Sequence, residues 1–271
     1  MKLKNVLSAA AVCAASVFAI SSCSKEKEAI TPVAEEGISQ SVLAQIKGMG
    51  LTTQDAKKVE GGYLVEGDIL ITPENLTAKP DYQMLRVGDE EQYRTTNLVS
   101  VGSGRTVSVQ VSTSLPSAYV TATDEAIRRY NAQGLLIRFT RVTSGGNIVL
   151  NQAPSGSSYL ASGGFPSGGN PYNQVLINSG AIGTANASTY IATILAHEIG
   201  HCIGFRHTDY AGRQYSCGGA AVNEGASTVG AIYIPGTATG NDPNSWMLAC
   251  IGSGANRPFN ANDVTALNYL Y

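Results

Sequence analysis

All three histidines of this 271-residue chain fall within residues 197–207, in the stretch HEIGHCIGFRH. On an α-helix, residues four apart differ by about 40° around the axis, so His197 and His201 project from one face, one turn apart. Gly204 can adopt the left-handed conformation that ends a helix, which turns the chain so that His207 returns toward the pair. The stretch therefore predicts a helix that stops at a glycine and three imidazoles that share one metal ion.

The chemistry expected of such a site is hydrolysis. Three protein nitrogens leave one coordination position for water, whereas structural zinc sites are usually closed by four protein ligands rich in cysteine. Zinc lowers the pKa of bound water to about 7 and polarises a carbonyl group. Glu198 follows the first ligand and can reach that water without binding the metal, as a general base must. We therefore expect a zinc endopeptidase that uses one catalytic ion and acts on proteins or peptides.

The motif HExxHxxGxxH resembles the long zinc motif of the metzincin metallopeptidases, and AHEIGHCIGFRHTD is similar to the bacterial HEIGH metallopeptidases, with the astacins as more distant relatives. The likeness covers roughly residues 100–271. It implies an α/β (α+β) metzincin-like catalytic domain with a twisted, mostly parallel sheet, an active-site helix, and an irregular C-terminal subdomain that ends in a helix. It also implies that Met247, in NSWMLAC, packs in a Met-turn under the imidazoles without binding zinc.

The resemblance suggests two further elements of the site. The segment VEGDI at residues 65–69 is similar to the aspartate element of astacin propeptides, so Asp68 is a candidate latency ligand at the water position; a plain turn is the alternative. The segment SYLASGGF at residues 158–165 stands where metzincins have the edge strand that binds substrate, although it also reads as a glycine loop. Its candidate substrate-binding residues are Tyr159, Leu160, Ala161 and Ser162.

The chain departs from the astacin pattern after the Met-turn, because Ala249 stands where astacins have a tyrosine that holds the transition state. An oxyanion donor must then come from elsewhere, and Tyr210 and Tyr215 are candidates. We interpret Asp209 either as a carboxylate that orients a liganding histidine or as a solvated loop charge.

The first residues have the layout of a secretory signal, with two lysines before an apolar run at residues 6–20 that is too short to span a bilayer. The tetrapeptide that ends at Cys23 resembles a bacterial lipobox, which predicts a lipid-anchored, outer-membrane or cell-surface protein; the alternative is an ordinary secreted protein. Residues 1–22 are then the signal peptide, and residues 23–40 form a flexible tether.

Residues 41–104 are expected to be a pro-like segment and linker, and residues 105–271 the catalytic domain. In the first part we expect helices at 41–50 and 52–62, one strand at 63–71, and a linker from residue 77. The strands expected in the catalytic domain are 105–113, 136–142, 147–153 and 173–179, and its helices are 117–134, 188–204 and 260–271.

Composition limits the partners and the cysteine chemistry. Loss of the signal peptide leaves 16 basic against 20 acidic side chains, which argues against nucleic acid because its binders need a basic face. We expect a monomer. The mature chain keeps three cysteines besides Cys23, so one disulfide can form between an unidentified pair of Cys202, Cys217 and Cys250, and Cys202 is expected to be structural. The competing functions are a surface binding lipoprotein with a non-catalytic zinc site and an amidase.

Overall fold

The structure is a computed structural model that describes residues 37–49, 51–77, 92–225 and 230–271. Backbone contacts divide the chain into residues 1–36 and a unit of residues 37–271. The expected signal peptide, Cys23 and most of the expected tether lie outside the described residues. None of the described helices combines the length and the apolar character that crossing a bilayer requires.

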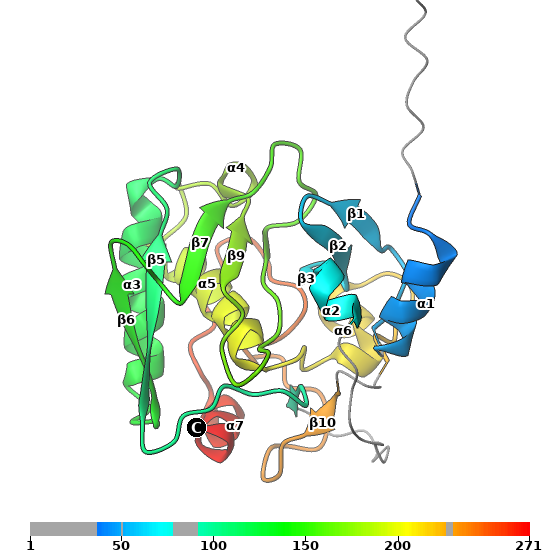
Figure 1. Ribbon diagram of the computed structural model, residues 1–271. Helices are drawn as coiled ribbons and strands as arrows, with labels where there is room; N and C mark the ends of the chain where they lie inside the picture. Colours follow the sequence, from blue (N-terminus) through cyan, green and yellow to red (C-terminus); the bar gives the residue numbers. More distant parts are fainter. Residues whose placement is uncertain (1–36, 50, 78–91, 226–229) are drawn as a thin grey trace, which may run out of the picture. The chain divides into compact units, whose positions relative to one another are not determined.

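A five-stranded sheet organises the unit (Figure 1). Its spatial order is β6-β5-β7-β9-β8, and every neighbouring pair is parallel except β8 and β9, which are antiparallel. The mostly parallel sheet predicted from the sequence is therefore confirmed. The strands are β5 (Arg105–Val111), β6 (Ile137–Val142), β7 (Ile148–Gln152), β8 (Ala161–Ser162) and β9 (Gln174–Ile177).

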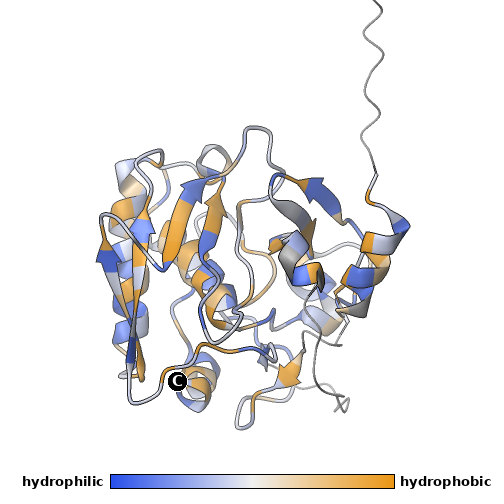
Figure 2. Cartoon of the chain, in the orientation of Figure 1, coloured by the Kyte–Doolittle hydropathy of each residue, from blue (hydrophilic) through white to orange (hydrophobic). Residues whose placement is uncertain are grey.

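Two long helices, α3 (Ser117–Asn131) and α5 (Ser188–Ile203), pack against each other and against strands of this sheet. Helix α3 is amphipathic, and the apolar residues of one face are buried (Figure 2). They are Tyr119, Ala122, Ala126, Ile127 and Tyr130. Helix α5 is buried on every side except near its first turn, because sheet, α3 and the C-terminal region surround it. A helix so enclosed is a rigid support for the side chains that it carries.

The N-terminal part of the unit differs from what the sequence predicted. Helix α1 (Gln40–Gly48) is confirmed, but the helix expected at 52–62 is wrong, because its last residues form strand β1 (Lys57–Val59). The single strand expected at 63–71 is a hairpin of β2 (Gly62–Val65) and β3 (Ile69–Ile71), antiparallel to each other. The chain turns between them at Glu66 and Gly67, whose φ angles are 54° and 92°. A short helix, α2 (Pro73–Thr77), follows.

The described part of the expected linker is bonded to the rest of the unit. Strand β4 (Tyr93–Arg94) pairs with β10 (Ile232–Tyr233), and the amide of the buried Gln92 donates to Ser245 Oγ and to Asp263. The backbone N–H of Thr95 donates to the carbonyl of Gly204, where α5 ends. Residues 92–95 therefore help to hold the end of the helix that carries two of the histidines.

The region beyond residue 208 is largely irregular, as expected. It holds short helical turns at η1 (Tyr210–Gly212) and α6 (Gln214–Cys217), while α4 (Ser179–Ile182) precedes α5. The chain ends in α7 (Ala261–Leu270), where Asn260 and Asp263 form a capping box.

Candidate metal centre and active site

Helix α5 ends at Gly204, as the sequence predicted. Gly204 has a φ of 115°, and its N–H donates to the carbonyls of Gly200 and His201. A side chain there would also meet Leu98 Cδ2 at 2.6 Å, so both the left-handed conformation and the close packing require glycine. The turn brings His207 back to the pair on the helix, and all three imidazoles are buried.

Each histidine is fixed through its Nδ1 atom. His197 Nδ1 lies 2.9 Å from the carbonyl oxygen of Trp246, and His201 Nδ1 lies 2.9 Å from that of Phe205. A carbonyl oxygen can only accept, so both Nδ1 atoms carry the proton and both Nε2 atoms keep their lone pairs in the neutral ring. His207 Nδ1 donates to Glu224 Oε1 at 2.8 Å. This pattern is typical of metal-binding histidines.

The three Nε2 atoms converge on the carboxylate of Asp68. The distances from Asp68 Oδ2 are 3.3 Å to His197 Nε2, 3.8 Å to His201 Nε2 and 2.9 Å to His207 Nε2. One ligand atom from each of these four residues lies within 4.8 Å of all the others. Burial alone would raise the pKa of Asp68, but the histidines hold it well below its usual range. The structure thus shows a site of three histidines and one aspartate.

Glu198 lies beside this site with an unsatisfied oxygen. Its side chain is buried, and Oε2 has no hydrogen-bond partner among the described residues. Burial, with a contribution from Asp68, raises the pKa of Glu198 well above its usual value. A Cβ atom on Gly163 would come within 3.1 Å of Glu198 Oε2, so the glycine leaves space at the carboxylate. A buried carboxylate with one unsatisfied oxygen beside a metal site is suited to accept a proton.

Met247 lies in a turn beneath the helix. Its side chain is fully buried, and its Sδ atom would stand 2.6 Å from a Cβ on Gly200, which lies between the two helical histidines. The same turn supplies the carbonyl of Trp246 to His197, and the carbonyl of Met247 accepts from Thr208 N. The turn therefore connects the helical pair to the chain that follows His207.

A buried charge cluster on the other side of His207 was not expected. Arg206 donates to Glu66 Oε2 at 2.7 Å and to Glu224 Oε2 at 3.4 Å, and all three side chains are fully buried. Burial raises the pKa of Glu66 despite Arg206, whereas His207 and Arg206 outweigh burial and lower that of Glu224. Glu224 therefore orients His207, and Glu66 connects the N-terminal hairpin to the same cluster.

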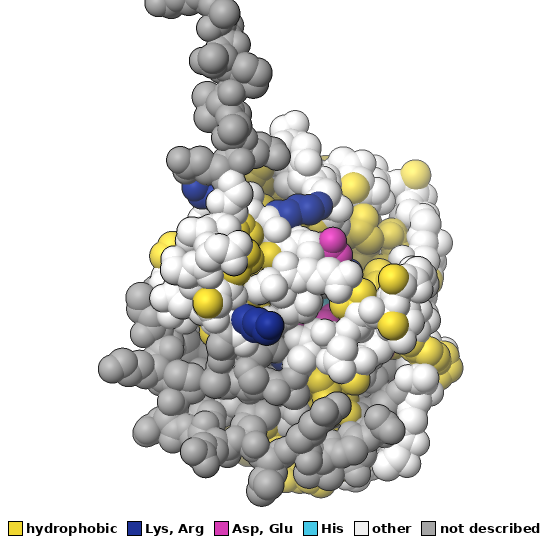
Figure 3. All heavy atoms as spheres, turned by 90° about the vertical axis from the view of Figure 1, so that its right-hand side faces the viewer, with side chains coloured by type: hydrophobic (Ala, Val, Ile, Leu, Met, Phe, Trp, Pro, Cys, Tyr) yellow, Lys and Arg dark blue, Asp and Glu magenta, His cyan; other side chains and the backbone are white. Residues whose placement is uncertain are grey.

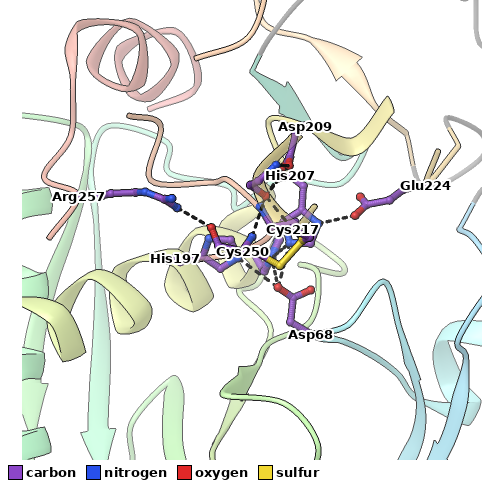
Figure 4. The surroundings of a disulfide bond; sticks show 11 residues. Asp68, His197, His207, Asp209, Cys217, Glu224, Cys250 and Arg257 are labelled. Atoms are coloured by element: carbon purple, nitrogen blue, oxygen red, sulfur yellow. Dashed lines mark hydrogen bonds and ion pairs between the residues drawn. A yellow bond between two sulfur atoms is a disulfide. The ribbon is translucent and has the colours of Figure 1, made fainter. Parts of the chain in front are cut away.

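The sequence assigned Asp209 either to a histidine or to solvent, and both interpretations are wrong. Asp209 is buried, and its carboxylate accepts from Ser216 and from the backbone N–H of Ala249. These contacts join the Met-turn region to the loop closed by the disulfide Cys217–Cys250 (Figure 4). Cys202 is a free, buried cysteine. The carboxylate that does orient a histidine is Glu224.

A cavity of about 280 Å³ opens beside His197 and Glu198. Of the proposed substrate-binding residues, Tyr159, Leu160 and Ala161 line it, whereas Ser162 does not. Neither Tyr210 nor Tyr215 is among its lining residues, so neither candidate oxyanion donor lies at the cavity. Figure 3 shows acidic side chains at the centre of one face and almost no histidine surface.

The predicted edge strand is an edge of the sheet, but its outer side is occupied. Strand β8 pairs with β9 on one side, as the metzincin resemblance implied. On the other side, Leu70 N donates to the carbonyl of Gly163 at 2.9 Å, and Ile69 bridges to Gly163 in parallel. The N-terminal hairpin therefore covers the cavity edge in addition to placing Asp68 at the histidines.

One protein family matches most of the chain. The family described as "Dual-action HEIGH metallo-peptidase" matches residues 63–271. No curated protein matches the chain. Two solved structures of myroilysin are similar to it. One has 15% sequence identity and a TM-score of 0.38, and the match covers 60% of this chain and 81% of that chain. The other has 16% identity and a TM-score of 0.41, and the match covers 63% of this chain and 81% of that chain.

The family match includes the hairpin that carries Asp68, the histidine helix and the Met-turn. Three histidines of one short motif, a buried carboxylate next to the first of them, and a methionine turn beneath them occur together within it. This chain belongs to the dual-action HEIGH metallopeptidase family.

Proposed function

We propose that the protein is a zinc endopeptidase in which His197, His201 and His207 bind the ion and Glu198 is the general base. The observation that carries this proposal is the buried Glu198 Oε2, which has no partner among the described residues and faces the cavity beside the histidines. Three imidazole nitrogens with free lone pairs, supplemented by a carboxylate, are a donor set that suits zinc.

Each group of residues at the site has its own role in this proposal. A zinc ion held by the three Nε2 atoms would supply acidity to the attacking water and polarisation to the scissile carbonyl. Glu198 takes the proton from that water and returns it to the nitrogen of the leaving amine. The carbonyls of Trp246 and Phe205 and the carboxylate of Glu224 keep the imidazoles oriented throughout.

Asp68 makes the chain described here a latent form in this proposal. Its carboxylate lies where the three Nε2 atoms converge, so it occupies the position that the attacking water needs. Glu66, two residues earlier, is tied to Arg206, and Leu70, two residues later, is hydrogen-bonded to Gly163. These contacts hold the hairpin in place, so the histidines become free when the hairpin moves away or when the carboxylate of Asp68 is removed.

The same aspartate favours a second candidate, a surface lipoprotein whose zinc site is permanently closed and non-catalytic. Four protein ligands are the usual number in structural zinc sites. The two candidates differ in what Glu198 does, because a purely structural site does not need a buried carboxylate with an unsatisfied oxygen.

The test uses the full chain and compares Asp68→Ala with Asp55→Ala, which changes an exposed aspartate of the same segment. We expect chelator-sensitive cleavage of casein in Asp68→Ala only, together with one zinc per chain by metal analysis. Adding Glu198→Ala to Asp68→Ala should abolish cleavage while the zinc remains. Zinc retention with no casein cleavage in Asp68→Ala, or in a chain cut within residues 78–91, would favour the non-catalytic site.

For localisation, we propose an exported lipoprotein anchored through Cys23 and otherwise monomeric. The disulfide Cys217–Cys250 supports export, because such bonds persist in oxidising compartments. Cys23→Ser should move the protein from the membrane fraction to the soluble fraction. Unchanged fractionation would indicate an ordinary secreted protein or another means of attachment.

A further inference from the structure

The cavity beside Glu198 has the size of a pocket for one side chain. Its volume of about 280 Å³ lies just below the range of about 300–1,000 Å³ that is usual for small-molecule sites. One part of its wall is apolar and includes Leu160, Ile194, Leu248 and Ile251. Two cations, Arg213 and Arg257, complete the wall.

Arg257 is held in place at this wall by neighbouring backbone and side-chain atoms. Its backbone N–H donates to Thr193 Oγ1 at 3.0 Å, which fixes the backbone of the loop at this residue. Thr193 lies one helical turn before His197. Its guanidinium donates through Nη1 to the carbonyl of Cys250 at 2.9 Å, next to the disulfide. Figure 4 shows the side chain reaching toward Cys250 and His197.

Arg257 makes no direct ion pair in the part of the chain that the structure describes. Its hydrogen bonds go to a carbonyl and a hydroxyl, and the carboxylates of Asp209 and Asp263 act on its charge only from a distance. Burial lowers the pKa of the guanidinium, which shows that its surroundings solvate the charge poorly. A half-buried cation with spare donors is stabilised by a carboxylate that can reach it.

Each carboxylate that lines the cavity already has another partner or role. Glu66 pairs with Arg206, Asp68 lies at the histidines, and Glu198 has its role beside the metal. Asp68→Ala removes one of these charges, and Glu66 stays paired with Arg206. In that chain, the two arginines are the lining charges that a substrate carboxylate can meet.

We propose that this pocket selects substrates with an aspartate or glutamate immediately after the scissile bond, through Arg257. The inference rests on the proposed peptidase function. The position follows from the proton transfer: Glu198 delivers its proton to the leaving amine, so the residue that contributes this amine lies on the Glu198 side, where the pocket opens.

The test uses the full chain with Asp68→Ala and two peptides that differ only by Asp or Asn after the scissile bond. Because Asp and Asn have the same shape, their kcat/KM ratio isolates the charge. We expect about a tenfold to a hundredfold preference for Asp, as a charge-assisted hydrogen bond provides. Arg257→Gln should bring the ratio close to one, and Arg257→Lys should retain part of it.

The control is Arg138→Gln, which removes an exposed arginine from strand β6 and should leave the ratio unchanged. Each ratio is measured within one variant, so a loss of folded protein cancels. Equal cleavage of the two peptides by the Asp68→Ala chain, or an Asp preference that survives Arg257→Gln, would overturn the inference.

A binding measurement separates this inference from the peptidase proposal. In the chain with Asp68→Ala and Glu198→Ala, fluorescence polarisation should give a Kd about tenfold lower for the Asp peptide than for the Asn peptide. If this difference in Kd is found but the Asp68→Ala chain, which keeps Glu198, cleaves neither peptide, the peptidase proposal is wrong and the pocket assignment stands. If the Asp68→Ala chain cleaves both peptides and their Kd values are equal, the peptidase proposal stands and the pocket assignment is wrong.

Discussion

The two sides of the metal site are held by different forces. His197 and His201 stand on a helix enclosed by apolar side chains, and their Nδ1 atoms bond to backbone carbonyls. His207 stands in irregular chain, and a buried cluster of charges holds it. The position of the two helical histidines depends on close packing, which a change of charge does not disturb. The position of His207 depends on buried ion pairs, and removing one partner leaves the other as an uncompensated buried charge.

The N-terminal hairpin interacts with the two sides unequally. Asp68 approaches all three imidazoles, but Glu66 is bonded through Arg206 to the cluster on the loop side alone. Departure of the hairpin therefore removes one carboxylate from the cluster and leaves Arg206 with Glu224. The helical pair keeps its backbone partners in either state, so the two sides respond differently to the same substitutions.

The largest expected effect is on the loop side. Arg206→Met leaves Glu66 and Glu224 as buried carboxylates without their cation, which should lower the free energy of unfolding by about 3–5 kcal/mol. Urea denaturation measures the loss. The same substitution at Arg141, whose pair with Asp124 is at the surface, should cost less than about 1 kcal/mol. Similar losses for the two variants would contradict the comparison.

The disulfide should have the next largest effect. Cys217 and Cys250 are 33 positions apart, and replacing both with serine should cost about 2–4 kcal/mol, since the unfolded loop is no longer closed. Reductant should destabilise the wild type by a similar amount and leave the double serine variant unaffected. A variant as stable as the wild type would show that the hydrogen bonds of Asp209 hold this loop by themselves.

A smaller effect is expected where the helix meets the Met-turn. In Gly200→Ala, the new methyl group would come within 2.6 Å of Met247 Sδ, and overpacking of this kind costs about 1–3 kcal/mol. Zinc affinity should fall with stability, because the turn also holds His197. Gly180→Ala is the control, since its new methyl group would lie at an ordinary 3.5 Å from Asn178 Oδ1. If calorimetry gives the two variants the same stability, the Met-turn can shift to accommodate the methyl group at little cost.

The smallest effect is expected at the outer surface of α3. The bonds from Arg128 and Arg129 lower the pKa of Glu125 to about 2, so its stabilisation is present above about pH 4.5 and is lost as the pH falls toward 2. Glu125→Gln should cost less than about 1 kcal/mol at pH 7. Melting temperatures of the variant and the wild type should converge near pH 2, and a difference that persists there would refute this assignment.

The sequence predicted the helical side well because its information is local. The spacing of His197 and His201, the stop at Gly204 and the apolar face of α3 each lie within one element, where helical periodicity determines the geometry. The strands of the main sheet were recognisable for the same reason. Met247 was found through a family resemblance, and the structure places it beneath the helix.

The loop side could not be predicted in the same way. Glu224 lies 17 positions after His207 in irregular chain, so no spacing rule connects them. The helix expected at 52–62 failed because pairing with β2 overrode a weak local preference, and the hairpin was missed because its turn includes Glu66 at a positive φ, which that residue type rarely adopts. Asp209 was misassigned because its partners come from two distant loops.

The contact of Leu70 with Gly163 has a consequence for handling the protein. Strand β8 is a border of the main sheet, and the hairpin bonds to the carbonyl of Gly163, the residue that follows the strand. Once the hairpin departs, that border presents unsatisfied donors and acceptors to any extended chain, another copy included. A mature enzyme of this design is therefore most prone to aggregate when it is concentrated without substrate, and the precursor is the form to purify and crystallise.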